Sequence, residues 1–154
     1  MKAVIIMGSG SDLDYCRKIA ENLSEFGINS ILRVASAHKT PQKVLEIIKE
    51  YEMDDVVFVT VAGRSNALSG FVDANTVKPV IASPPYSDRF AGMDILSSIR
   101  MPSGVAPLFV MEAENAALAV AKIVALTDEK VREKVKNYQD RKKEEIYKAD
   151  DELR

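Results

Sequence analysis

A loop rich in glycine and serine, Gly8-Ser9-Gly10-Ser11-Asp12, occurs near the start of the chain. It lies between an apolar run over residues 3–6 and a segment of helical periodicity that ends at Phe26. In such a strand–loop–helix unit the glycines let the backbone approach a ligand, and the first helical N–H groups favour an anion. The loop is therefore predicted to bind a phosphate. The alternative is that Ser11 or Asp12 only caps the helix.

The sequence contains one histidine, His38, in the segment Ser36-Ala37-His38-Lys39. This segment follows a predicted strand over residues 30–34. Because imidazole exchanges a proton near neutral pH, we expect His38 to act as a general acid/base rather than to have a structural role only. A metal centre is not expected, since one histidine and one cysteine without clustered carboxylates make no set of ligands. No serine lies in a nucleophile-elbow pattern, and no cofactor is expected.

A second polar loop, Gly63-Arg64-Ser65-Asn66, follows the most strongly β-branched run in the chain, residues 55–61. Lys39 and Arg64 are expected to bind a phosphate or carboxylate, although single basic side chains are more often solvated surface charges. Asp12 has two interpretations that can coexist. It could accept hydrogen bonds from sugar hydroxyls beside a phosphate, or it could cap the helix that follows it.

Short apolar runs alternate with segments of helical periodicity along the chain, which predicts a parallel sheet covered by helices on both faces. The favoured topology is a single-domain, flavodoxin-like three-layer sandwich, in which ligands bind at the carboxyl ends of the strands. The loops after the first three strands should therefore meet. Strands are predicted over residues 3–6, 30–34, 55–61, 79–82 and 107–111. Helices are predicted over residues 16–26, 41–51, a short stretch before Pro79, 93–99, 116–126 and the charged segment 128–154. Thr40 and Thr127 are predicted to cap the helices that follow them.

The composition limits the classes of protein to which the chain can belong. Its 154 residues, 47% hydrophobic and 29% charged, predict one soluble globular domain. A net charge of -2 is not that of a protein that binds nucleic acid or an anionic membrane. With a single cysteine, Cys16, the chain can form no internal disulfide, which favours the cytoplasm as its compartment. Cys16 itself is expected to be buried. The apolar start breaks at Gly8 and is too short for a signal peptide or a membrane span.

Three of these stretches, Gly8–Asp12, Ser36–Pro41 and Met101–Gly104, closely resemble the signature stretches of the PurE family of de novo purine synthesis. The resemblance runs through residues 3–126 in the same order and spacing. Residues 1–126 are therefore expected to form a PurE-like α/β domain, with 127–154 as a charged helical extension of it. The family commonly forms homo-octamers with active sites completed by neighbouring subunits. This implies that Met101–Gly104 contributes to a neighbour's site and that the apolar segment 116–126 is buried in the assembly.

The family has two branches, which differ in the loop after the central strand. The mutase branch carries a histidine there, whereas this chain has Gly63-Arg-Ser-Asn-Ala-Leu-Ser-Gly70 without one. The loop resembles that of the carboxylase branch, as does Ser83-Pro84-Pro85. Lys39, where mutases commonly have arginine, indicates the same branch.

The resemblance implies carboxylation of 5-aminoimidazole ribonucleotide with CO2, without biotin, metal or nucleoside triphosphate. His38 would remove the proton from the ring carbon that attacks CO2. The alternatives are an N-carboxyaminoimidazole ribonucleotide mutase and a non-catalytic phosphate- or nucleotide-binding module. The residues implied to bind the phosphate are Ser9, Ser11, Ser36 and Lys39, and Asp12 is implied to bind the ribose. Gly8 and Gly10 belong to the same loop as Ser9. The loop that faces the base and CO2 contributes Gly63, Arg64, Ser65, Asn66 and Leu68.

Overall fold

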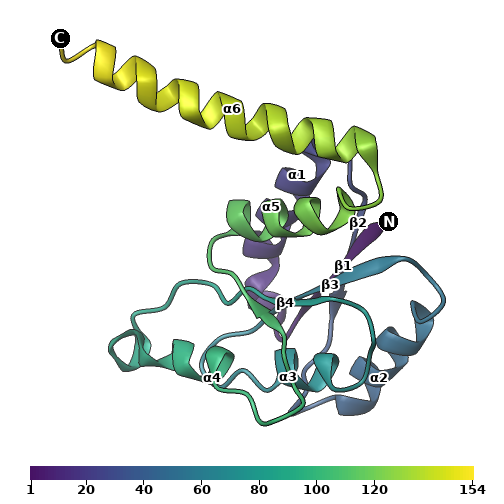
Figure 1. Ribbon diagram of the computed structural model, residues 1–154. Coiled ribbons are helices and arrows are strands. Elements are labelled where there is room, and N and C mark those ends of the chain that lie inside the picture. Colours follow the sequence, from purple (N-terminus) through teal and green to yellow (C-terminus); the bar gives the residue numbers. More distant parts are fainter.

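Five strands form one fully parallel sheet in the order β2-β1-β3-β4-β5. The computed structural model describes all residues, 1–154, and Figure 1 shows how the strands and helices are arranged. This strand order confirms the flavodoxin-like topology predicted from the sequence. The strands are β1 (Lys2–Met7), β2 (Ser30–Val34), β3 (Val56–Val61), β4 (Val80–Ala82) and β5 (Leu108–Phe109).

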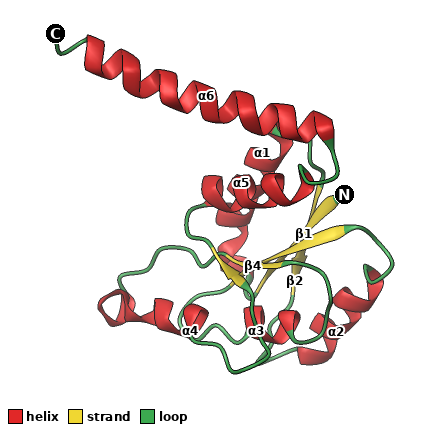
Figure 2. Cartoon of the chain, in the orientation of Figure 1, coloured by secondary structure: helices red, strands yellow, loops and turns green.

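Helices cover both faces of this sheet (Figure 2). Side chains of a strand alternate between faces, so β1 contributes Ile5 and Met7 to the core beneath α1 and α5 and Val4 and Ile6 to the core beneath α2 and α3. The helices are α1 (Leu13–Glu25), α2 (Pro41–Glu50), α3 (Leu68–Asp73), α4 (Leu96–Ile99), α5 (Ala113–Val124) and α6 (Glu129–Asp151), with short 3-10 turns η1 (Gly10–Asp12) and η2 (Arg89–Ile95).

The central strand is β3, which pairs with β1 on one side and β4 on the other. All six of its residues are buried. A strand covered on both faces cannot alternate apolar with polar residues, and this is why its sequence is almost continuously apolar. The prediction of a central strand here is confirmed, and its carboxyl end delivers the Gly63–Asn66 loop.

Several predicted boundaries are wrong. The first helix begins at Leu13 rather than at residue 16, and the helix predicted over 93–99 is the end of the 3-10 turn η2 followed by the short helix α4. The last strand has two residues instead of the five predicted over 107–111, because its partner β4 is itself only three residues long and leaves little backbone to pair with. The helix predicted over 116–126 begins at Ala113 and ends at Val124. Glu112, at a φ of 67°, turns the chain directly into the helix, which therefore begins about one turn earlier than predicted.

The apolar helix α5 is covered within the chain. Val120 and Val124 belong to the same buried cluster as Ile19 of α1 and Val131 and Val135 of α6. The helix α6 thus covers part of α5 within the chain, and burial of the segment 116–126 in a subunit assembly stays a prediction. Figure 1 shows the distal part of α6 extending away from the body of the domain, and every residue after Tyr138 is exposed.

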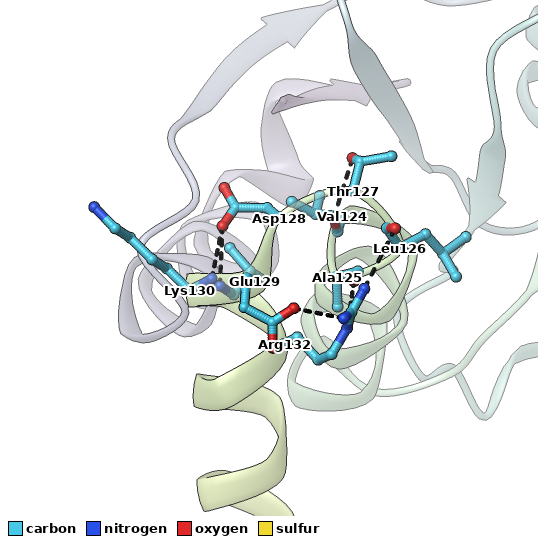
Figure 3. Close-up of polar contacts among 9 residues, drawn as sticks. Val124, Ala125, Leu126, Thr127, Asp128, Glu129, Lys130 and Arg132 are labelled. Carbon is cyan, nitrogen blue, oxygen red and sulfur yellow. Dashed lines mark hydrogen bonds and ion pairs between the residues drawn. The ribbon is translucent and has the colours of Figure 1, made fainter.

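The start of α6 is capped by Asp128, and not by Thr127 as predicted. The Asp128 carboxylate accepts hydrogen bonds from the N–H groups of Lys130 at 3.0 Å and Val131 at 3.2 Å, and Figure 3 shows both. Arg132 donates to the carbonyl oxygen of Ala125 at 3.1 Å and so ties α6 to the end of α5. No helix of the structure combines the length and the apolar character that a membrane span requires.

Candidate active site

A cavity of about 550 Å³ opens at the carboxyl ends of β1, β2 and β3. The loops that follow these three strands meet there, as the topology predicted. Most of its lining is polar or charged. The lining residues are Gly8, Ser9, Ser11, Asp12, Ser36, Ala37, His38, Lys39, Ala62, Gly63, Arg64, Ser65, Ala67, Leu68, Pro85, Ser87, Arg89 and Asp94.

The first loop is organised by Ser9 rather than by the residues predicted to cap the helix. The Ser9 hydroxyl oxygen accepts hydrogen bonds from the N–H of Ser11 at 3.3 Å and from the Ser11 hydroxyl at 2.9 Å. Asp12 makes no capping bond to α1. The interpretation of Ser11 or Asp12 as simple helix caps is therefore wrong, and Asp12 lines the cavity. Burial raises its pKa.

The second loop is closed on itself by Ser36 and Thr40. The Ser36 N–H donates to the Thr40 hydroxyl at 2.9 Å, and the Lys39 N–H donates to the Ser36 hydroxyl at 3.3 Å. This closed turn presents His38 and Lys39, both exposed, to the cavity. Thr40 directly precedes α2 as predicted, but its side chain does not cap the helix because it is bonded back to Ser36.

The third loop contains Arg64 in the left-handed backbone region, at a φ of 58°. A residue with a Cβ pays about 1–2 kcal/mol for this conformation. Contacts from a distant segment hold it in place: the Arg64 N–H donates to Asp94 Oδ2 at 3.3 Å, and the Ser97 hydroxyl donates to the Arg64 carbonyl oxygen at 3.2 Å. The turn thus places Arg64 and Ser65 on the cavity wall.

Two residues of the predicted site do not line the cavity. Gly10 lies in the first turn of η1, beside the loop that does. Asn66 is 5% exposed, and its amide is bonded to Ser69 and Ser98 inside the protein.

Besides Ala37, Ala62 and Ala67 in the first-named loops, sequence reasoning missed a whole lining segment, which contributes Pro85, Ser87, Arg89 and Asp94. They follow β4, whose carboxyl end lies at the same edge of the sheet as the other three loops. These residues could have been predicted from their position, because Ser83–Asp88 has the sequence of a loop that follows a strand. The fold-back of η2 toward Gly63 was not visible, since it depends on contacts with residues 30 positions earlier.

The cavity has a local excess of positive charge in a chain whose net charge is -2. Lys39, Arg64 and Arg89 face two carboxylates, Asp12 and Asp94. This balance favours an anionic ligand. No group of three or more histidine, cysteine or acidic side chains is arranged to hold a metal ion. Burial raises the pKa of the Cys16 thiol to about 12, so it is protonated at neutral pH.

Comparison with known proteins places the chain in a family. The family model described as AIR carboxylase matches residues 2–145, which extends past residue 126 into α6. A phosphoribosylaminoimidazole carboxylase of Archaeoglobus fulgidus is 78% identical over all of this chain and 86% of its own length. An N5-carboxyaminoimidazole ribonucleotide mutase of Methanocaldococcus jannaschii is 42% identical over 97% of this chain and 96% of its own.

A solved structure leads to the same family. The crystal structure of Treponema denticola PurE superimposes with a TM-score of 0.96 at 47% identity, covering 99% of this chain and 98% of that one. These matches span nearly the whole chain. They therefore include the signature stretches, the parallel sheet and the cavity at its carboxyl edge. The chain belongs to the AIR carboxylase family, to which PurE belongs.

Proposed function

We propose that this chain carboxylates 5-aminoimidazole ribonucleotide with CO2 to give 4-carboxy-5-aminoimidazole ribonucleotide in purine biosynthesis. The observation that carries the proposal is the convergence of His38, the Ser9–Asp12 loop and the Arg64 turn on one cavity. An anion-binding loop, an imidazole and a cationic turn are the three parts that this reaction needs. The 78% identical relative named for this activity supports the same assignment.

The ribonucleotide phosphate binds against Ser9, Ser11, Ser36 and Lys39. Hydroxyl and backbone N–H groups donate to the phosphate oxygens, and the ammonium of Lys39 adds a charge-assisted bond. The carboxylate of Asp12 accepts hydrogen bonds from the ribose hydroxyls. With these two groups fixed, the imidazole base lies between His38 and the loop that runs from Gly63 to Leu68.

The reaction begins when the exocyclic amine of the substrate pushes electron density onto ring carbon four. That carbon attacks the carbon of CO2, a C–C bond forms, and one C=O electron pair moves onto oxygen to give a carboxylate. Ring carbon four then carries both the carboxylate and its original proton. His38 removes this proton and the ring regains aromaticity. The guanidinium of Arg64 stabilises the negative charge of the forming carboxylate.

The second candidate is the mutase reaction, which one relative's name supports. The purified protein is supplied with aminoimidazole ribonucleotide and CO2, and separately with the N-carboxy compound, while carboxyaminoimidazole ribonucleotide is followed by absorbance. We expect turnover of the first mixture. Turnover of the N-carboxy compound alone would assign the mutase, and turnover of neither would leave a binding module.

We further propose that the protein works in the cytoplasm as a homo-octamer. Exposed apolar side chains support association, among them Phe90 and Met93 of η2 and Ile146 and Tyr147 of the distal part of α6. Met101–Gly104, which lies outside the cavity of its own chain, contributes to the site of a neighbouring subunit. Light scattering coupled to size exclusion measures the molar mass, and a stable monomer would contradict this proposal.

A further inference from the structure

A buried polar network lies directly behind the cavity wall formed by the third loop. At its centre is Asn66, whose side-chain nitrogen donates to the hydroxyls of Ser69 at 2.7 Å and Ser98 at 3.0 Å. Its side-chain oxygen accepts from the Ser69 N–H at 3.1 Å. Both amide protons are therefore used inside the protein, and neither is left for a ligand in the cavity.

The network has a fixed direction of donation. The Thr60 hydroxyl donates to the carbonyl oxygen of Ile81 at 3.2 Å, which uses its only proton. The bond of 2.8 Å between Thr60 and Ser69 must therefore be donated by Ser69. Ser69 in turn accepts from Asn66. A series of hydrogen bonds thus starts at the Asn66 amide, passes through the Ser69 and Thr60 hydroxyls and ends on the backbone of β4.

The backbone of Asn66 belongs to a second set of contacts, which hold the Arg64 turn. The Asn66 N–H donates to the Ser97 hydroxyl at 2.9 Å. Ser97 shares its own proton between the carbonyl oxygens of Asp94 at 2.7 Å and Arg64 at 3.2 Å. With the bond from the Arg64 N–H to Asp94, the turn is tied to residues 94–98 at both of its ends.

We propose that Asn66 is a positioning residue: its buried amide fixes the turn that holds Arg64 and Ser65 against the reacting carboxylate. This inference rests on the proposed carboxylase function, because it assigns Arg64 to that carboxylate. Asn66 acts through the turn and touches no substrate atom. It therefore governs the chemical step, while the phosphate and ribose contacts of the first two loops are independent of it.

The test is the N66D variant with N75D as its matched control. N66D keeps the size of the side chain and its acceptor but removes both donated bonds. Asn75 is exposed and donates only to the carbonyl oxygen of Phe71, so N75D makes the same chemical change away from the cavity. We expect N66D to lower kcat by about 10- to 100-fold with the KM for the ribonucleotide changed less than about threefold. N75D should change neither.

A second variant, S97A, removes the hydroxyl that joins the Asn66 N–H to the Arg64 carbonyl oxygen and leaves the side-chain bonds of Asn66 in place. It covers the case in which N66D does not fold, and it should lower kcat in the same way. A loss expressed in KM with kcat retained would overturn the inference, because it would place Asn66 in substrate binding.

Hydrogen exchange separates this inference from the proposed function, because it needs no turnover. The Arg64 amide should exchange faster in N66D and S97A than in the wild type and N75D. Failure of the wild type to carboxylate the ribonucleotide would refute the function alone, and the exchange rates would still decide the role of Asn66. An Arg64 amide that exchanges at the wild-type rate in N66D, or in S97A where N66D does not fold, would overturn the inference.

Discussion

The backbone N–H of Arg64 donates to the carboxylate of Asp94, 30 residues further along the chain, at 3.3 Å. Both residues line the cavity, and the bond joins the loop after β3 to the 3-10 turn η2. Because Arg64 is in the left-handed region, its position depends on such contacts more than an ordinary loop residue does. The geometry of the cavity wall is thus set by two segments together.

Replacement of His38 by asparagine should abolish most turnover and leave substrate binding in place. Asparagine keeps a polar side chain of similar size but cannot accept the proton from ring carbon four. General base catalysis contributes about 10²- to 10⁴-fold, so we expect kcat to fall within that range. Product absorbance measures turnover and titration calorimetry measures binding of the ribonucleotide. Turnover near the wild-type rate would remove His38 from the proton transfer.

Replacement of Lys39 by alanine should weaken binding of the ribonucleotide and affect kcat much less. A charge-assisted hydrogen bond to phosphate contributes about 1.5–3 kcal/mol, which corresponds to a rise in Kd of about 10- to 100-fold. K43A is the control, because Lys43 lies on α2 outside the cavity and pairs with Glu46 at 3.0 Å. Equal affinities of K39A and K43A would show Lys39 to be a solvated charge.

Replacement of Asp12 by asparagine should stabilise the fold and impair function. Burial raises the pKa of Asp12 in the folded state, so its protonated form is favoured there. The stabilising contribution is present below the unfolded pKa and is lost as pH rises through the folded pKa. At neutral pH the ionised carboxylate therefore costs stability, and D12N removes that cost.

Urea unfolding measures this effect of D12N. The free energy of unfolding should exceed that of the wild type at pH 7, with the difference shrinking as pH is lowered toward the pKa. D14N is the control, since Asp14 is exposed on α1. The KM for the ribonucleotide should rise about 10-fold in D12N through loss of a charged acceptor for the ribose. A stability difference that does not vary with pH would contradict the assignment to burial.

The contact between Tyr138 and Glu114 should make docking of α6 sensitive to alkali. The Tyr138 hydroxyl donates to the Glu114 carboxylate, and its ring packs on Phe26 with centroids 5.4 Å apart. Burial, together with the bond to Glu114, raises the pKa of Tyr138 to about 12. The stability this contact adds is present below pH 10 and is lost as pH rises from about 10 to about 12.

The Y138F variant keeps the ring and removes the hydroxyl. The free energy of unfolding should fall by about 0.5–1 kcal/mol at pH 7, and the loss between pH 10 and pH 12 should be smaller than in the wild type. Y147F, on the exposed part of α6, should match the wild type at both pH values. Equal alkaline losses in Y138F and the wild type would assign the loss to other groups.

The sequence by itself determined the order and kind of most elements. Apolar runs of strand length alternate with helical periodicity, and local signals such as Pro41 and Gly27 mark helix boundaries correctly. Gly27 has a φ of +76° and follows Phe26, the C-cap of α1. The topology rules for parallel sheets then placed the loops carrying Ser9, His38 and Arg64 at one edge. These properties are local or follow from connectivity, so they can be derived without coordinates.

Only the tertiary structure decided which side chains of those loops face the cavity. Asn66 and Arg64 are close neighbours in a polar loop, yet one is buried and the other lines the cavity wall. The cause is a set of hydrogen bonds donated by Arg64 and Asn66 to Asp94, Ser97 and Ser98, about 30 residues away. The extent of β5 was likewise set by β4, its pairing partner from an earlier part of the chain. Pairing across such separations depends on packing, and no local sequence pattern records it.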